Sequence, residues 1–581
     1  MAPKRKRTAS VVAAPTRRQI LVGVDFGTTF SGVAWAQTSC PELQTTIIQW
    51  PDRDGSLEGQ TSEKVPTELS YTDTDCLWGF GIPDEQPRHQ WFKLSLDPNQ
   101  KSNELSLLAV DYPDPKALPP GYNDEPSRTK LVTDYLTKLQ QHTEKILRRK
   151  LGDSIFDTTP LCYTITVPAV WSDPAKARTH RCACRAGMGH DLKIVSEPEA
   201  AIMYALNTMD SQNLRVKDNF VLCDAGGGTV DLITYTIRSL KPTLKVREAV
   251  PGGGGACGST FLNRIFRRYL EESLSDLDGF DDDTLEDALN EFENITKRRF
   301  TGQEQSIVIR VPGLTDNIAK GIKRQKLTIK AAVLKDLFNP VMTAITTLVK
   351  HQLQQSKGAR AVILVGGFGQ SPYLRSCIQQ VIGKDIEIMQ PAYGWTAVVR
   401  GALLHALHDI TPDELRVTVD SRRVRRAYGS RCLKPYDISY HMGLAKDWND
   451  FQGRYDVTAM RWFVQKGHEV DQETPVTTEW FLPRLVSEGP YQVRSFTLYT
   501  FTPKHEEPAP RFPCEEIKEF VTLTADLASI DHSEIPIKVG KDGKDYYVLE
   551  YQIKVAFFSA HMEFSLWRLG KQYGKVEAEF L

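Results

Sequence analysis

The chain has 581 residues, a formal net charge of −1 and a hydrophobic content of 41%. This is the composition of a globular protein that is too long for one hydrophobic core. The balanced charge gives no support for nucleic acid as a partner, and no apolar run reaches the ~20 residues of a membrane span. The ten cysteines follow no disulfide spacing and no signal-peptide pattern precedes them, so we expect a reducing compartment.

The first 18 residues contain the basic cluster Lys4 to Arg7 and few large apolar side chains. This composition predicts a disordered tail. A cluster of four basic residues is also typical of nuclear targeting signals. We therefore expect a cytoplasmic protein, with entry into the nucleus as the alternative.

Two segments far apart in the chain repeat one pattern: an apolar strand, an aspartate, and a glycine turn with small hydroxyl residues. The first runs from Leu21 to Gly32 and the second from Phe220 to Asp231. Glycines let the backbone approach a bulky anion and point its N–H groups at phosphate oxygens. A carboxylate at the end of such a strand can hold a hydrated Mg²⁺. The repeat predicts a duplicated fold in which each half grips one side of a nucleotide.

With these two turns the sequence resembles the 70-kDa heat-shock chaperones of the actin-like ATPase superfamily. Three further motifs match the family, at residues 165–173 and 194–201 between the two turns and at residues 361–374 after them. All five motifs occur in the order typical of the family. Trp171, in the motif at residues 165–173, resembles the divergent branch of the family that has no helical lid. The resemblance covers residues 20–407 and implies an α/β fold.

The resemblance also implies how the chain is divided. We expect a disordered tail over residues 1–18, and a duplicated actin-like, ribonuclease-H-like ATPase domain with two lobes over residues 19–408. A linker over residues 409–415 and a smaller, β-rich, sandwich-like domain over residues 416–581 follow. The linker does not match the short hydrophobic linker of the chaperones, and the sequence shows no helical lid after the last strand pattern.

In this family the site would bind ATP or ADP with Mg²⁺, and the metal would be held by Asp25 and Asp224. Lys93, Glu197 and Asp231 would orient the water that attacks the γ-phosphoryl group, and Thr229 would shuttle its proton. The residues that the resemblance places around the nucleotide are Gly27, Thr28, Thr29, Gly226, Gly227, Gly228, Thr229, Gly258, Glu293, Lys297, Gly366 and Gly367.

Four of these residues also fit interpretations without a function. Lys93 follows a Trp-Phe pair and would also suit the surface. Glu197 would also suit the start of a helix, where the helix dipole stabilises a negative charge. Glu293 and Lys297 would equally suit a solvated helix face. For Lys93 and Glu197 the matching neighbours favour the functional interpretation.

Gly258 ends a literal G-x-G-x-x-G pattern, which is typical of dinucleotide-binding proteins. That site needs the loop to open a βαβ unit directly after a strand. Pro251 is expected to interrupt the strand before this loop. The pattern therefore favours a turn that contacts phosphates over a dinucleotide site.

The segment at residues 361–374 resembles the adenosine motif of the family, and this motif and the helix that begins at Trp395 depart from the chaperones at three positions. Gln370 stands where they carry an arginine that stacks on the purine, Phe368 replaces a serine, and Trp395 replaces an acidic residue. The phosphate and magnesium residues match the family. The departures therefore concern the recognition of the base.

Apolar spacing predicts one amphipathic helix through Tyr135, Leu139 and Ile146, and two further helices on either side of Pro340. Residues 96–128 are rich in Pro, Asp and Asn and predict a loop.

From residue 416 the apolar pattern changes to period two, which is typical of strands. The cluster Arg422, Arg423, Arg425, Arg426 and Arg431 predicts a charged edge or an exposed strand face, with anion binding as the alternative. Residues 462–467 resemble the strand that enters the peptide-binding β-sandwich of the chaperones.

The sequence thus indicates an ATP-binding protein with slow, Mg²⁺-dependent hydrolysis and chaperone-like binding of polypeptide, with co-chaperones as further partners. One alternative is a nucleotide-gated scaffold or sensor that hydrolyses negligibly and serves one dedicated protein partner. The missing linker and lid favour this alternative, whereas the complete set of acidic residues favours the ATPase. A small-molecule kinase is the third interpretation, because sugar kinases share the superfamily fold, but no separate sugar-site insertion is evident.

Overall fold

The structure is a computed structural model. The residues that it describes are 18–51, 61–73, 75–83, 86–97, 108, 111–112, 125–208, 214–241, 243–356, 358–408, 417–471, 474–489, 491–503, 507–528, 530–575 and 577–580. The predicted tail (except Arg18), the predicted linker and most of the predicted loop 96–128 lie outside the described residues.

A mixed sheet is formed by strands from the first 200 residues. β1, β2 and β3 make an antiparallel meander, and β8 and β9 continue the sheet in parallel on the other side of β1. In sheet order the strands are β3 (Cys40–Thr46), β2 (Phe30–Gln37), β1 (Ile20–Asp25), β8 (Leu161–Val167) and β9 (Lys193–Ser196), with β4 (Val65–Pro66) paired to β2. The turn after β1 carries the first glycine motif.

A second mixed sheet repeats this plan. β10, β11 and β12 form the meander, and β15 and β16 continue in parallel beside β10. The order is β16 (Glu387–Met389), β15 (Ala359–Val365), β10 (Asn219–Ala225), β11 (Val230–Ser239), β12 (Leu244–Gly255), β17 (Val417–Arg423) and β21 (Glu469–Asp471). The last two strands come from beyond residue 416, and β17 pairs in parallel with β12.

Two helices pack together between the sheets. α11 (Ala397–His408) lies against β1 and β2, and α5 (Glu197–Thr208) shares a core with β10 and β11. A Cβ atom at Gly401 would lie 1.7 Å from the carbonyl oxygen of Ala200. Only glycine therefore permits this approach of the two helices, which places the start of α5 close to both sheets.

The first crossovers are α2 (Glu125–Leu151), which lies between β1 and β8 in the chain, and α4 (Asp173–Ala183), which joins β8 to β9. The predicted stripe on α2 is confirmed, because Tyr135, Leu139 and Ile146 are buried. Ser172 caps α4 through a hydrogen bond from the Ala175 N–H.

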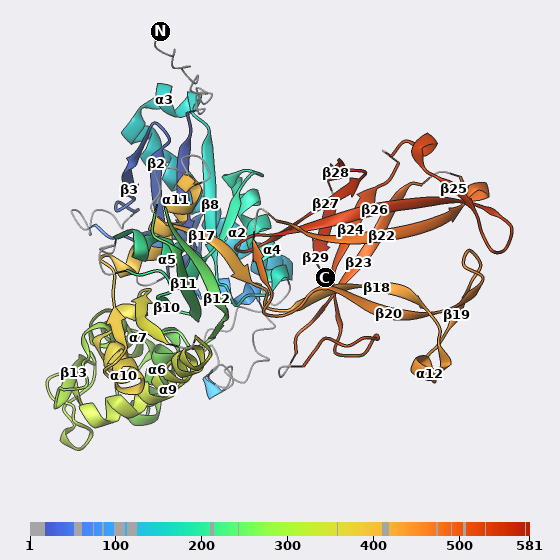
Figure 1. The fold of residues 1–581 in the computed structure, drawn as a ribbon. Helices are drawn as coiled ribbons and strands as arrows, with labels where there is room; N and C mark the ends of the chain where they lie inside the picture. Colours follow the sequence, from blue (N-terminus) through green and yellow to red (C-terminus); the bar gives the residue numbers. More distant parts are fainter. Residues whose placement is uncertain are drawn as a thin grey trace, which may run out of the picture.

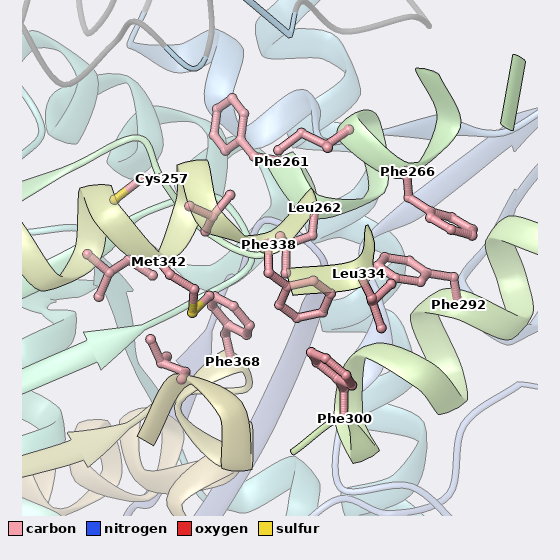
Figure 2. Packing of buried hydrophobic residues seen from close by; sticks show 14 of the residues in the cluster. Cys257, Phe261, Leu262, Phe266, Phe292, Phe300, Leu334, Phe338, Met342 and Phe368 are labelled. Carbon is pink, nitrogen blue, oxygen red and sulfur yellow. The ribbon is translucent and has the colours of Figure 1, made fainter. Parts of the chain in front are cut away.

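A helical region lies between β12 and β15. Its elements are α6 (Thr260–Leu274), α7 (Asp282–Glu291), η7 (Phe292–Thr296), α8 (Lys297–Arg299), the hairpin of β13 (Ser306–Arg310) and β14 (Lys326–Lys330), and α9 (Ala331–Ser356). The later helix α10 (Pro372–Ile382) packs against α9. Figure 2 shows its aromatic core, in which Phe266 and Phe292 stack with ring centroids 4.2 Å apart. This core holds α8 in place beside the loop that precedes α6.

The expectation of two helices around Pro340 is wrong, because α9 continues through this proline. A proline inside a helix costs about 3 kcal/mol. Phe338 and Val341, on either side of it, are fully buried, and burial of such side chains contributes about 1.5–3 kcal/mol each. Length and composition alone would let α9 cross a membrane, but here its apolar side chains belong to the core in Figure 2.

The expectation that Pro251 interrupts its strand is also wrong. β12 continues to Gly255, and its register against β11 shifts near Pro251, between the pairs Thr234–Val250 and Leu232–Gly253. A proline is tolerated at such an irregularity, because the missing N–H falls outside the regular ladder.

The strands after β17, except β21, form two further sheets, which lie to one side of the remaining elements in Figure 1. One has the order β19 (Asp447–Asn449), β20 (Arg454–Val464), β18 (Ala427–Pro435), β23 (Val493–Phe501), β24 (Lys518–Asp526) and β29 (Glu577–Phe580). The other consists of β22 (Val476–Leu485), β26 (Asp545–Phe557), β27 (Met562–Arg568) and β28 (Lys571–Lys575), with β25 (Ile537–Val539) on β26. The two sheets share one apolar core. The predicted alternation is confirmed at Ile553, Val555 and Phe557, which are buried.

The remaining elements are short. A small sheet contains β6 (Cys76–Trp78), β5 (Glu68–Tyr71) and β7 (His89–Gln90). The short helices are η1 (Gly79–Gly81), η2 (Phe92–Leu96), α3 (Asp153–Thr158), η5 (Cys184–Met188), η8 (Ile318–Lys320), η9 (Phe368–Gln370), η10 (Gly394–Thr396), α12 (Ile438–His441), η11 (Val486–Glu488) and η12 (His532–Glu534).

The predicted exposed face of arginines is wrong for most of the cluster. Arg422 donates two hydrogen bonds to the carboxylate of Glu199, at 2.9 and 2.5 Å, and Arg423 lies 3.2 Å from Glu469. Only Arg431 is exposed. The reason is the pairing of β17 with β12, which carries the arginines at the end of β17 to carboxylates of α5 and β21.

Candidate functional site

The two glycine turns meet at a cavity of about 220 Å³. Its walls include every residue predicted for the site except Asp231 and Gly258. The further lining residues are Phe30, Lys64, Ser259, Arg298, Phe368, Gln370, Ser371, Trp395 and Val398. Segments from the whole length between residues 25 and 398 therefore converge on one place.

Each turn places an aspartate at the end of the strand before it. Asp25 ends β1 and faces Gly32 on β2, whereas Asp224 lies near the end of β10 and faces Asp231 on β11. Side chains alternate along a strand, and both aspartates are buried. The repeated hairpins thus bring equivalent carboxylates to the same cavity.

The tips of the two turns touch. A Cβ atom at Gly227 would lie 2.4 Å from the hydroxyl of Thr29, and a Cβ at Gly228 would lie 2.6 Å from the hydroxyl of Thr28. Real Cβ atoms do not approach other atoms this closely, so glycine is required for the close contact of the turns. Backbone N–H groups and threonine hydroxyls from both turns therefore line one narrow pocket.

Gly258 lies behind the second turn. Its N–H donates to the carbonyl oxygen of Gly228 at 3.1 Å, and the Thr260 N–H donates to that of Gly227 at 2.9 Å. A Cβ at Gly258 would lie 2.4 Å from the Gly227 oxygen. This segment supports the turn, and the neighbouring Ser259 lines the cavity.

Two buried ion pairs lie in the cavity walls. The ammonium of Lys93 donates to Glu197 at 2.7 Å, and the ammonium of Lys64 donates to Asp25 at 2.6 Å. Lys93 is 2% exposed, so its interpretation as a surface lysine is wrong. Burial raises the pKa of Glu197, and the charge of Lys93 opposes this rise only in part.

Asp224 has no ion pair within the described part of the chain. Burial raises the pKa of this carboxyl well above its usual range, and the charges of Glu197, Asp231 and Asp25 add to the rise. Burial also raises the pKa of Asp231, although the Val170 N–H donates to its carboxylate at 3.1 Å. Around the two glycine turns, the buried carboxylates of Asp25, Glu197, Asp224 and Asp231 thus outnumber the ammonium groups of Lys64 and Lys93.

This imbalance fits a divalent cation. Asp25, Glu197, Asp224 and Asp231 are all buried near the two lysines. No group of three or more metal-binding side chains close enough to ligate one ion directly is found among the described residues. Mg²⁺ keeps several waters and uses one or two carboxylates. The donor set therefore fits a hydrated Mg²⁺ at Asp25 and Asp224.

The other end of the cavity is apolar and aromatic. A Cβ at Gly367 would lie 3.3 Å from the Trp395 ring, and Phe30 meets that ring edge-on with centroids 5.7 Å apart. The guanidinium of Arg298 lies 5.9 Å from the Trp395 centroid. Gly366 has a φ of +87°, as its position in a tight turn requires. The three departures from the family pattern all lie at this end.

Glu293 and Lys297 form an ion pair one helical turn apart at the edge of the cavity. Lys297 is 4% exposed, and burial lowers its pKa. The interpretation of Lys297 as part of a solvated helix face is therefore wrong. Glu293 is half-buried.

Sequence reasoning missed Lys64, Ser259, Arg298 and Phe30 as lining residues. Lys64 belongs to no motif and reaches Asp25 only because β4, which follows it directly, pairs with β2. The signal for Ser259 was its place directly after the glycine turn that ends at Gly258.

Comparison with known proteins agrees with this geometry. Residues 121–412 match the family described as Hsp70 protein. The human heat shock 70 kDa protein 12A is 24% identical over 527 residues, which cover 73% of each chain. The human heat shock 70 kDa protein 12B is 22% identical over 522 residues, covering 73% of this chain and 72% of that protein.

A more distant bacterial relative matches as well. The chaperone protein HscA homolog of Chromobacterium violaceum is 24% identical over 392 residues, which cover 64% of this chain and 56% of that protein. The family match spans half of the chain and includes the second glycine turn and the motif at 361–374. The protein belongs to the Hsp70 family.

Proposed function

We propose that this protein binds ATP with Mg²⁺ and hydrolyses it slowly. The observation that carries the proposal is the convergence of two glycine turns and the buried carboxylates of Asp25, Glu197 and Asp224 on one cavity, with Asp231 paired to Asp224 behind it. Glycine turns suit phosphates, and the surplus of carboxylates suits a metal ion that accompanies the phosphates. Family membership supports the same proposal.

In this proposal, different residues of the cavity bind the phosphates, bind the metal ion and stabilise charge during phosphoryl transfer. Thr28, Thr29 and the second turn hold the phosphate chain, while Asp25 and Asp224 hold Mg²⁺, which when bound neutralises phosphate charge. Lys93 places a cation near the γ-phosphoryl group, where charge develops during transfer.

The nucleophile in this proposal is a water molecule. Glu197 and Asp231 orient it, and Thr229 relays its proton. Their burial raises the pKa of both carboxyl groups, which makes each a stronger proton acceptor once ionised. A base with a pKa nearer to neutrality is more effective at physiological pH.

We further propose that the two meander sheets are the cores of two lobes around the cavity. The strands that follow β17 then form a β-sandwich that binds polypeptide, and co-chaperones would act on the same cycle. The common apolar core of the two last sheets supports this arrangement. Residues 19–408 and 416–581 remain the proposed domain limits, although β17 and β21 belong to the second sheet.

A nucleotide-gated scaffold with negligible hydrolysis is the second candidate. The aromatic end of the cavity favours it, because Trp395, Phe368 and Gln370 replace residues that hold the base in the chaperones. A protein that binds the phosphates well and the base differently can retain binding while its turnover is very low.

Single-turnover hydrolysis of radiolabelled ATP, with Mg²⁺ or with EDTA, tests the proposal. We expect phosphate release that requires Mg²⁺. Tight binding without release would support the scaffold, and the absence of binding would contradict both functions.

A further inference from the structure

A second cavity, of about 110 Å³, lies where the strands beyond residue 416 meet α4, α5 and β12. We call it the seam cavity. Its walls come from the turn between β17 and β18, the loop between β26 and β27, and residues 169–176. It shares no lining residue with the candidate nucleotide cavity.

The seam cavity is rich in positive charge. Its cationic lining residues are Lys176, Arg422, Arg423, Arg425 and Arg426, and its carboxylates are Asp173, Glu199 and Glu248. With His561 neutral, positive charges exceed negative ones among these residues. Such an excess in a recess between protein segments attracts anions.

Only some of these cations have a close carboxylate: Arg422 is paired with Glu199, and Arg423 lies 3.2 Å from Glu469 outside the lining. Arg425 is 3.5 Å from Glu248, and Lys176 is 3.9 Å from Asp173, at the limit of an ion pair. Arg426 has no ion pair within the described ranges. The lining therefore contains cations whose charge is only partly balanced.

Several guanidinium N–H groups also lack acceptors. The Arg422 Nη1, Arg423 Nε and Arg425 Nε atoms are buried and have no hydrogen-bond partner in the described part of the protein. A buried donor without an acceptor costs free energy. An oxyanion in the cavity would supply acceptors and charge together.

The burial of Lys176 is a separate indication that the seam cavity binds an anion. Its side chain is only 9% exposed. Burial, together with the charges of Arg425 and Arg426, lowers the pKa of Lys176 to about 8, although the charge of Asp173 opposes this. A cation held in this position is destabilised by its surroundings, and a bound anion would reverse that destabilisation.

We propose that the seam cavity is a binding site for a small tetrahedral oxyanion, with inorganic phosphate as the ligand. A water needs ~10–15 Å³ of such space, so the cavity has room for several waters or for one ion of this size. Guanidinium groups bind phosphate oxygens in pairs, and a lysine adds a point charge. This proposal does not depend on the proposed ATPase function.

The location gives the site a consequence. Val170 and Ser196 line the seam cavity. The Val170 N–H donates to Asp231, and Ser196 directly precedes Glu197. The Ser559 hydroxyl, from the loop between β26 and β27, donates to Ser196 at 3.1 Å. An anion in the seam cavity would hold the strands beyond residue 416 against the segments that position the two proposed catalytic acids, Glu197 and Asp231.

Equilibrium dialysis with radiolabelled inorganic phosphate tests the site. The full chain is measured at constant ionic strength, alone and saturated with Mg²⁺ and a non-hydrolysable ATP analogue. We expect one phosphate to remain bound in the presence of the analogue, because the glycine turns are then occupied. Sulfate should compete with phosphate, whereas nitrate should not.

Two variants locate the site. Arg426→Gln and Lys176→Met should each weaken phosphate binding about tenfold, as expected for the loss of one charged contact. Arg431→Gln removes an exposed arginine of the same cluster and should bind like the wild type. Melting temperatures establish that each variant is folded.

Three results would overturn the proposal. These are no phosphate bound by the wild type, complete displacement of phosphate by the ATP analogue, and unchanged affinity in both folded variants. The wild-type measurement decides the question even where a variant does not fold.

Discussion

The two ends of the candidate nucleotide cavity differ in how strictly their geometry and charge limit the residue types at each position. At the phosphate end, the approach of the turns leaves space only for glycine at positions 227 and 228. Two of the buried carboxylates there, Asp25 and Glu197, are paired with Lys64 and Lys93. At the base end, Trp395 meets the Phe30 ring edge-on and Arg298 through a cation–π interaction.

This difference shows which part of the site can change during divergence. Charge and backbone geometry at the phosphates allow few substitutions, because an unpaired buried charge costs several kcal/mol. Stacking surfaces can be built from several residue types, since every base has a π-face. Substitutions at the phosphate end should therefore have the larger effects.

The largest effect is expected for Asp224→Ala. It removes a carboxylate that fits Mg²⁺ and has no cation partner among the residues that the structure describes. Mg²⁺-dependent hydrolysis should therefore fall about a thousandfold, as expected when a main electrostatic contribution to catalysis is lost. Single-turnover assays measure this loss. Asp191→Ala, at an exposed aspartate, is the matched control. Hydrolysis at the wild-type rate in Asp224→Ala would remove this residue from the site.

Lys64→Met should have the next largest effect. The change leaves the buried Asp25 carboxylate without its cation, and such a loss costs about 3 kcal/mol of unfolding free energy. Urea unfolding in EDTA measures the loss. Added Mg²⁺ should restore part of it if Asp25 holds the metal, whereas an equal loss with and without Mg²⁺ would contradict that role.

A smaller effect is expected from the titration of Glu197. Its pKa in the folded protein lies above the ordinary value of 4.5, so the unfolded chain releases this proton first as pH rises. The free energy of unfolding should therefore fall with pH above that value, by at most ~1.4 kcal/mol per pH unit, and level off above the folded pKa.

Urea unfolding of the metal-free protein between pH 5 and 7.5 tests this dependence. Asp224 and Asp231 act in the same direction, so the informative quantity is the difference between the wild type and Glu197→Gln. That variant should show a shallower slope, whereas Glu272→Gln, at an exposed site on α6, should not. Equal slopes for Glu197→Gln and the wild type would refute a raised pKa.

The smallest effect is expected at the base end. Trp395→Ala removes a stacking surface worth about 1 kcal/mol, so ATP affinity should fall roughly fivefold. The affinity for inorganic triphosphate, which has no base, should stay the same. Titration calorimetry with both ligands separates the two ends of the cavity. An equal loss for both ligands would show that Trp395 acts on the phosphate end.

Much of the cavity could be predicted because its signals are local. Each glycine turn, its aspartate and the strand before it lie within a dozen residues, and the cap at Ser172 and the proline after Glu197 mark helix starts in the same way. Such patterns are recognisable because neighbouring residues in the chain determine the backbone geometry that they need.

The sequence by itself thus determined the duplicated turns, the acidic residues and the helix starts of this protein. Only the tertiary structure decided that Lys64 pairs with Asp25, that Arg422 pairs with Glu199, and that α9 continues through Pro340. Each of these depends on segments far apart in the chain, whose burial and charge are defined only after they pack. For the same reason, the arginines that looked like an exposed strand face became the lining of the seam cavity.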